Sequence, residues 1–192
     1  MYGIDISENN GQLDWSAIEN YNANTDKPIG FAIVRSSYGK TGVDNRFTEN
    51  VNGAHSVGLK VGAYHYGYAL DNSQAITEAQ NCKNVIDNSG VLLELPVFYD
   101  MEDADGFKRK REFDFSLSTG ICKSFLDNIG LGCGIYASYS WLTDVIDWKS
   151  LGCAVWNAQW GAEDNLKGYI WQYTDSLVIP EFGNVDGDVL YD

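Results

Sequence analysis

The sequence has few of the features that mark membrane, secreted or metal-binding proteins. Its 192 residues contain no run approaching the roughly 18 consecutive apolar residues that a transmembrane helix needs. The N-terminal segment has neither a basic leader nor a long apolar run, so no signal peptide is visible. Two histidines and four cysteines without a CxxC pair argue against a structural zinc site. We therefore expect a folded, non-membrane protein that needs no metal or other cofactor.

Basic residues are also scarce. The chain has 13 Lys and Arg against 27 Asp and Glu, a net charge of −14. A protein that binds a phosphate backbone needs a basic face, so nucleic acid is excluded as a partner of the whole chain. Four of the basic residues stand together at 108–111. We expect a solvated loop there, and contact with an anionic polymer is the alternative.

The rare reactive side chains have simple interpretations. The four cysteines lie in predicted helices or at the starts of predicted strands, which favours buried free thiols. Two disulfides are the alternative in an oxidising compartment. His65 stands between two tyrosines in a predicted strand and is expected to be structural, while His55 lies in a predicted helix.

The organisation indicates one domain over residues 1–192. Only three prolines and no low-complexity stretch interrupt the chain. Strands and helices alternate until about residue 150, where strands alone continue, and this alternation predicts a parallel sheet with helical crossovers. Because a full eightfold barrel needs about 250 residues, we expect an abbreviated barrel that is covered by helices on one side. The predicted strands are Tyr2–Ser7, Phe31–Ser37, Lys60–Ala69, Leu95–Glu102, Cys133–Ser138, Cys153–Trp160, Gly168–Thr174 and Asn184–Tyr191.

Helix ends can also be located in the sequence. Asp14 and Asp71 stand where N-caps are expected, and side-chain oxygens of such residues accept hydrogen bonds from the first helical N–H groups. Gly58, Gly90 and Gly130 follow helical stretches where a left-handed residue is expected.

Acidic residues gather at the carboxyl ends of the predicted strands, which is where barrel enzymes place their active sites. Asp100 and Glu102 are two residues apart and share one face of a strand. Asp5 lies in the first strand, and Asp186 and Asp188 lie in the last. Asp100 and Glu102 could simply point into solvent at a strand end. Its alternative role is an acid/base pair with separated pKa values, as in glycosidases.

The aromatic composition favours the second interpretation. Tyr and Trp supply 18 of the 26 aromatic residues, and their flat apolar faces with polar edges suit stacking on sugar rings. Each of them taken singly could also be a core residue. The candidate substrate-binding residues are Tyr64, Tyr66, Tyr136, Gln159, Trp160, Trp171 and Asp188.

Six segments taken in chain order resemble the family 25 glycoside hydrolases, the N-acetylmuramidase type of lysozyme. These segments are Tyr2–Ser7 with the following Asp14-Trp15, Phe31–Ser37, Gly58–Tyr66, the Asp-x-Glu of Asp100 and Glu102, Trp171-Gln-Tyr173, and Asn184–Gly187. The resemblance covers essentially the whole chain. It implies a flattened TIM-like (β/α)5β3 barrel of the α/β class, in a single domain.

The resemblance also implies an activity and its residues. The activity is hydrolysis of the β-1,4 bond between N-acetylmuramic acid and N-acetylglucosamine in bacterial peptidoglycan. Glu102 becomes the general acid, Asp100 assists at the anomeric carbon, and Asp5 and Asp186 complete the acidic cluster. The chain departs from the family pattern at Gly187-Asp188, where an apolar residue and an amide are expected.

Several alternatives stay open at this stage. Hydrolysis can be retaining, inverting or assisted by the 2-acetamido group of the substrate, and the last route is our working hypothesis. The alternative functions are a non-catalytic glycan-binding barrel and a glycosidase acting on another N-acetylated polymer. We expect a monomer that acts on the bacterial cell wall. The absence of a visible signal peptide favours a phage endolysin exported through a membrane hole, with a trimmed extracellular protein as the alternative.

Overall fold

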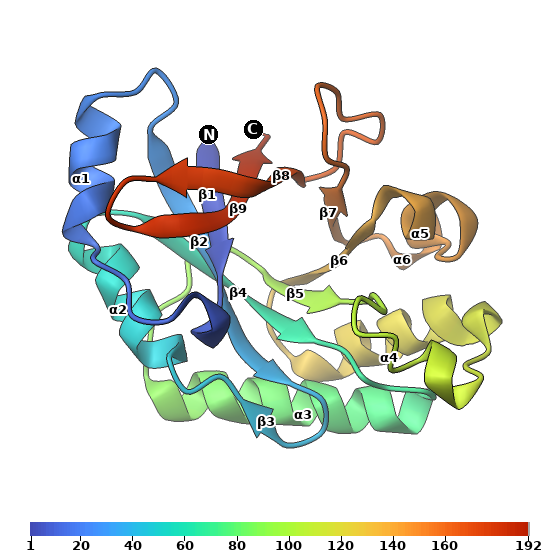
Figure 1. Cartoon of the computed structure of the whole chain (residues 1–192). Helices are drawn as coiled ribbons and strands as arrows, with labels where there is room; N and C mark the ends of the chain where they lie inside the picture. The colour runs from blue at the N-terminus through green and yellow to red at the C-terminus, as the bar shows by residue number, and fades with distance from the viewer. Residues whose placement is uncertain (192) are drawn as a thin grey trace.

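Eight strands close into a barrel, and in Figure 1 its helices lie to the left of the strands, below them and to their right, with none above them. The structure is a computed structural model and describes residues 1–191. The strands are β1 (Tyr2–Ile6), β2 (Ile29–Tyr38), β3 (Gly42–Val43), β4 (Lys60–Tyr66), β5 (Val97–Asp100), β6 (Cys133–Ser138), β7 (Ala154–Ala158), β8 (Ile170–Ile179) and β9 (Gly183–Leu190). The helices are α1 (Ser16–Ala23), α2 (Phe47–Ser56), α3 (Asn72–Ser89), α4 (Ser118–Ile129), α5 (Tyr139–Asp144) and α6 (Trp148–Leu151).

The strand order confirms the predicted barrel. Strands β1, β2, β4, β5, β6, β7 and β8 follow one another as parallel neighbours. Strand β9 pairs antiparallel with both β8 and β1, and this closes the barrel. Helices connect the first six barrel strands, whereas β7, β8 and β9 follow one another without helices. The short β3 pairs with the end of β2 and lies outside the barrel.

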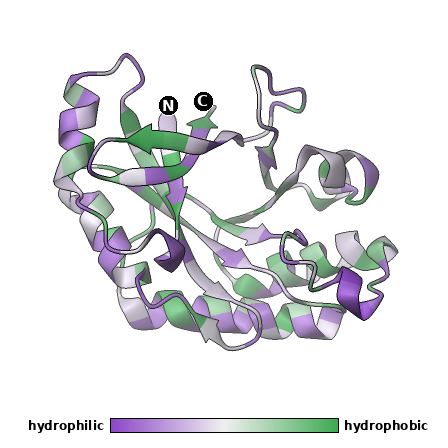
Figure 2. Ribbon diagram, in the orientation of Figure 1, coloured by the Kyte–Doolittle hydropathy of each residue, from purple (hydrophilic) through white to green (hydrophobic). Residues whose placement is uncertain are grey.

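The barrel separates two hydrophobic cores. Because successive residues of a strand point to opposite faces, one strand can contribute to both cores. The larger core fills the space between the strands and the helices, and Figure 2 shows that both kinds of element carry hydrophobic and hydrophilic residues. The smaller core fills one end of the barrel interior and consists of Phe31, Ile33, Phe98, Trp156, Ile170 and Leu190.

Most local predictions are confirmed. The Asp71 side chain caps α3 by accepting from the Gln74 N–H at 2.8 Å. Gly90 and Gly130 end α3 and α4 with a φ of 66° each. Asp14 precedes the N-cap of α1 by one residue, although its side chain accepts from the Ser16 N–H at 3.0 Å.

Most strand boundaries differ from the prediction by a few residues, and the ends of β5 and β8 are two clear cases. Strand β5 ends at Asp100, so Glu102 lies beyond the strand in the loop that follows. Strand β8 continues to Ile179, five residues past the predicted end, because its outer half pairs with β9 in a hairpin. Alternating periodicity is weak in that half, since its side chains are largely exposed to solvent.

The rare side chains largely follow the sequence prediction. All four cysteines are free, and Cys82 and Cys122 are buried as predicted, whereas Cys133 and Cys153 are only partly buried. His65 is buried, and its Nδ1 lies 2.8 Å from the Ser37 hydroxyl and its Nε2 3.7 Å from the Glu78 carboxylate. The basic segment needs a correction, because Lys108 is buried rather than solvated. In residues 1–191, every helix is too short or too polar to cross a membrane.

Candidate active site

The acidic residues meet at the mouth of the barrel. Asp5 lies on β1, Asp100 ends β5, Glu102 follows it, and Asp186 lies on β9. Together they line a cavity of about 180 Å³, so the structure brings the four predicted catalytic carboxyls into one place. The complete lining is Asp5, Asn9, Arg35, Tyr64, Tyr66, Asp100, Glu102, Tyr136, Trp156, Gln172 and Asp186.

One wall of this cavity carries Asp100 and Glu102. Asp100 is only 4% exposed, and its Oδ1 has no hydrogen-bond partner within residues 1–191. Burial and the neighbouring Glu102 raise the pKa of Asp100 well above its ordinary value, whereas Lys108 and Arg35 oppose this shift. Burial raises the pKa of Glu102 to about 7, against the opposing charge of Lys108. We call Asp100, Glu102 and Lys108 the lysine-backed wall.

The opposite wall carries Asp5 and Asp186, which face each other across the β1–β9 pair. The Gln172 side-chain amide donates to Asp5 Oδ2 at 2.8 Å and to Asp186 Oδ2 at 3.2 Å. Burial raises the pKa of Asp186 to about 6. Burial and the charges of Asp188 and Asp186 raise the pKa of Asp5 well above its ordinary value. We call Asp5, Asp186 and Gln172 the amide-backed wall.

Asp188 lies behind this wall rather than in the cavity lining. It is fully buried and accepts a hydrogen bond from Trp156 Nε1 at 2.8 Å. Burial raises the pKa of Asp188 to about 8, and the charge of Asp186 adds to the shift. A carboxyl with such a pKa exchanges its proton close to neutral pH, and its charge then acts on the neighbouring Asp5.

Gln172 joins the amide-backed wall to the aromatic residues. Its Oε1 accepts from the Tyr136 hydroxyl at 3.0 Å and from Trp160 Nε1 at 3.1 Å. These bonds fix the orientation of the amide, so that its NH2 group points toward Asp5 and Asp186. The sequence places Gln172 next to Trp171, and strand alternation separates the two: Gln172 is buried in the interior, whereas Trp171 is half-buried on the other face.

Arg35 and Asn9 are cavity residues that the sequence prediction missed. Arg35 Nε donates to Asp44 at 2.9 Å and its Nη2 to Glu8 at 3.3 Å, so its hydrogen bonds go to these residues rather than to the catalytic carboxyls. A signal for Arg35 existed, because Phe31, Ile33 and Arg35 share one strand face. Asn9 lies in a short turn after β1, where the sequence carries no comparable signal.

Some of the predicted sugar-binding residues line the cavity, and others lie outside it. Tyr64, Tyr66 and Tyr136 line the cavity. Trp160 is 61% exposed and lies at the rim, where Gln172 accepts from its indole N–H. Trp171 donates to the Gln159 carbonyl at 2.7 Å.

Gln159 uses its own side chain within the loop after β7. Its Oε1 accepts from the Asn165 N–H at 3.0 Å, so Gln159 and Trp171 brace that loop outside the cavity lining.

A second hollow of about 520 Å³ adjoins the cavity, since Asn9, Arg35 and Tyr66 line both. Tyr38 and Tyr68 form its aromatic side, and the Tyr66 and Tyr68 ring centroids are 5.0 Å apart. The site is therefore a groove with a small acidic end and a larger aromatic end. Within residues 1–191, no group of three or more His, Cys, Asp or Glu is arranged to hold a metal ion.

The arrangement suits acid-assisted cleavage. Like charges and burial separate the protonation states of neighbouring carboxyls, so one can donate a proton while another stays ionised. Glu102 has the pKa expected of a general acid at neutral pH.

Comparisons with known proteins agree with this geometry. Residues 4–182 match the profile of the Glycosyl hydrolases family 25. The autolytic lysozyme of Clostridium acetobutylicum is 28% identical over 192 residues, which cover 97% of this chain and 52% of that protein.

Solved structures share the fold. The modular autolysin LytC from Streptococcus pneumoniae, in complex with a synthetic peptidoglycan ligand, has a TM-score of 0.85 and 24% identity over 99% of this chain and 46% of that chain. The CTP1L endolysin has a TM-score of 0.79 and 24% identity over 100% of this chain and 66% of that chain. The chain thus spans about half the length of the autolytic lysozyme and of the autolysin. By its match over residues 4–182 and by its barrel, the chain belongs to the glycosyl hydrolases of family 25.

Proposed function

We propose that this protein is a muramidase that hydrolyses the β-1,4 bond between N-acetylmuramic acid and N-acetylglucosamine in peptidoglycan. The observation that carries the proposal is Glu102, a carboxyl with a pKa of about 7 that shares a 180 Å³ cavity with three other carboxyls. The name of the autolytic lysozyme supports the same substrate, as does the peptidoglycan ligand bound to the related autolysin.

The residues divide the chemistry between them. Protonated Glu102 donates its proton to the leaving glycosidic oxygen as the C–O bond breaks. The ionised carboxylate of Asp100 stabilises the positive charge that develops at the anomeric carbon. Asp5 and Asp186 face the same space from the amide-backed wall and complete the negative environment.

The nucleophile in this proposal is the 2-acetamido oxygen of the substrate. It attacks the anomeric carbon and forms a cyclic intermediate, which Asp100 stabilises and water then opens with retention. Solvolysis in isotopically labelled water reports the anomeric configuration of the new end. Inversion would contradict this route and leave the muramidase proposal intact.

The groove suits a polymer. The acidic cavity accommodates the bond that is cleaved, and the adjoining aromatic hollow with Tyr38, Tyr66 and Tyr68 offers faces on which further sugar rings stack. Trp160 at the rim provides a further aromatic face, next to Gln172.

Digestion of purified peptidoglycan tests the function. After borohydride reduction, mass spectrometry should detect new muramitol ends from the wild type. Glu102→Gln should lower the rate by about 10³-fold, the middle of the range for removal of a general acid. Glu112→Gln is the matched control, because Glu112 is exposed on the same loop and lies outside the cavity lining.

The other outcomes identify the alternatives. Glucosaminitol ends would keep a hydrolase and move the cut to the other bond. Turnover of chitin without turnover of peptidoglycan would indicate a glycosidase for another N-acetylated polymer. Binding without new ends would indicate a glycan-binding barrel.

We further propose that residues 1–192 form one catalytic domain that acts on the cell wall as a monomer, in the manner of a phage endolysin. The large exposed apolar residues include Val43 on β3, Leu92 between α3 and β5, and Val178 on β8, and these separate segments do not suggest a single oligomer interface. Light scattering after gel filtration tests the monomer. Lysis on external addition, compared with lysis on expression with and without a membrane-permeabilising protein, tests the export route.

A further inference from the structure

The first residue of the basic segment differs from its neighbours. Lys108 is 1% exposed, whereas the side chain of the adjacent Arg109 is 71% exposed. Its Nζ donates to the Gly67 carbonyl at 2.5 Å and to the Glu102 carbonyl at 2.6 Å. A buried ammonium group loses its hydration, so its position needs strong compensating interactions.

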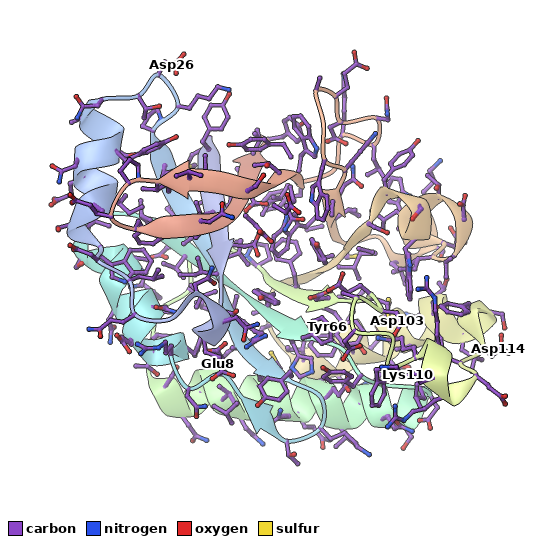
Figure 3. The ribbon with its side chains drawn as sticks, in the orientation of Figure 1. Glu8, Asp26, Tyr66, Asp103, Lys110 and Asp114 are labelled. Carbon is purple, nitrogen blue, oxygen red and sulfur yellow. The ribbon has the colours of Figure 1, made fainter. Side chains whose placement is uncertain are left out.

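The loop between β5 and α4 is built to turn Lys108 inward. The buried Asp103 carboxylate accepts from the Lys108 N–H at 2.6 Å and from the Arg109 N–H at 3.1 Å. The Lys108 carbonyl then accepts from the Phe113 N–H at 3.2 Å. Figure 3 labels Asp103 and Lys110 on this segment. These hydrogen bonds fix the loop backbone around Lys108 independently of the contacts that its side chain makes at the barrel.

The two carbonyls that Lys108 contacts belong to neighbouring strand ends. Gly67 follows directly after β4, and its N–H donates to the Asp100 carbonyl at 3.0 Å. Glu102 is two residues beyond the end of β5. The ammonium thus ties together the two strand ends that carry Tyr66 on one side and Asp100 and Glu102 on the other.

Several charged groups face Lys108 from the elements packed around it. These groups are Glu78 on α3, Asp100 at the end of β5, Glu102 after it, and Asp103 in the loop. The Glu78 carboxylate is occupied by the Tyr99 hydroxyl at 2.9 Å and the Tyr68 N–H at 3.0 Å. In the described part of the chain, none of these carboxylates forms an ion pair with Lys108.

We propose that Lys108 is a positioning residue for the reaction proposed above. Its ammonium holds the backbone of Glu102 against the end of β4, and its charge favours the ionised forms of both Asp100 and Glu102 against the effect of burial. The inference rests on the proposed function and goes beyond it. It assigns a role in the acid/base pair to a residue that lies behind the strand ends and outside the cavity lining.

The electrostatics agree with this geometry. The positive charge of Lys108 lowers the pKa values of both Asp100 and Glu102, which burial raises. For Glu102, the charges of Asp105, Asp186 and Asp103 act in the opposite direction. Loss of the ammonium should therefore move both carboxyls to higher pKa values, and Asp100 would be protonated over more of the working pH range.

Kinetics of Lys108→Met test the proposal. We expect kcat to fall by about 100-fold, as for a small misplacement of a reacting group, with a much smaller change in KM. Both limbs of the pH profile should move to higher pH. Arg109→Met is the matched control, and it should keep the wild-type kcat and pH profile because Arg109 is exposed.

A purely structural role has a different signature. In that case the melting temperature of Lys108→Met falls, while the folded fraction keeps the wild-type kcat and the wild-type pH limbs. That result would overturn the proposal. Lys108→Arg separates the two effects: it should leave the pH limbs near their wild-type positions because the charge remains, and lower kcat because a guanidinium group cannot reproduce the same two bonds.

A measurement on the wild type covers the case in which Lys108→Met does not fold. Nitrogen-15 NMR should show a protonated, slowly exchanging Lys108 ammonium throughout the titration of Glu102. A neutral amine in that range would refute the electrostatic role. If the wild type cleaves no glycan at all, the proposed function fails separately, and carbon-13 NMR titration of Glu102 in wild type and Lys108→Met still tests the effect of the charge.

Discussion

The two walls of the cavity hold their carboxyls in different ways. Behind Asp100 and Glu102 stands a full positive charge, the buried ammonium of Lys108. Facing Asp5, Asp186 and Asp188 stand neutral donors, the Gln172 amide and the Trp156 indole. Both walls are acidic, and burial raises the pKa values of their acids.

This difference indicates which wall can carry charge during the reaction. A buried carboxylate is stabilised far more by a nearby cation than by a neutral amide, because the desolvation penalty is large. We therefore assign the changing charges to the lysine-backed wall. The amide-backed wall orients Asp5 and Asp186. Asp188, which lies behind it with a pKa of about 8, binds a proton near neutral pH.

The largest effect should come from the lysine-backed wall. Asp100→Asn removes the carboxylate that we propose stabilises the developing positive charge, but keeps the shape of the side chain. We expect kcat on peptidoglycan to fall by about 10³-fold, the upper range for loss of one electrostatic stabiliser. Reducing-end release measures it, and a loss smaller than tenfold would contradict the assignment of charge to this wall.

A smaller loss of activity is expected when Gln172, the neutral donor of the amide-backed wall, is replaced by an acid. Gln172→Glu adds a carboxyl to the amide-backed wall and removes the NH2 group that serves Asp5 and Asp186. Activity should fall by about 10- to 100-fold at neutral pH, within the range seen when supporting hydrogen bonds are lost. It should recover partly at lower pH, where a protonated glutamate donates again. An equal loss at every pH would show that the donor itself is not the cause.

The smallest effect concerns stability. The pKa of Asp188 is about 8 in the folded state, against an ordinary value of 3.8. The folded state therefore binds this proton more tightly, and the resulting stabilisation is complete below about pH 4 and disappears as pH rises through 8. Asp188→Asn keeps an acceptor for Trp156 and does not titrate.

Calorimetry across this range checks the prediction. The melting temperature of the wild type should fall as pH rises, and that of Asp188→Asn should fall less. Near pH 8 the variant should melt about 3 °C higher, as expected for about 1 kcal/mol in a domain of this size. A parallel decline of both proteins would place the titrating group elsewhere.

Much of this architecture is readable from the sequence. The alternation of strands and helices up to residue 150, followed by strands alone, predicts the observed barrel, and the Asp-x-Glu at the end of a buried strand predicts the position of two cavity carboxyls. Strand parity places Tyr64 and Tyr66 on the cavity side of β4 and His65 on the other.

Other features could not be obtained this way. Trp160 and Trp171 are both aromatic residues of the kind that stacks on sugar rings. Trp160 lies at the rim of the cavity, whereas Trp171 braces a loop outside the cavity lining. The sequence also does not show which of the four basic residues at 108–111 is buried. Which of them turns inward depends on the loop conformation fixed by Asp103, a residue with no motif of its own.

The sequence by itself determined the order of strands and helices, the face of each strand that is buried, and the acids that stand at strand ends. These properties follow from periodicity and from local hydrogen bonding, which act over a few residues. Only the tertiary structure decided that Asp5 meets Gln172 across 167 positions of the chain and that Lys108 stands behind Glu102. The reason is that the barrel closes through pairing of β1 with β9, and the pKa values depend on burial and on charges that closure brings together.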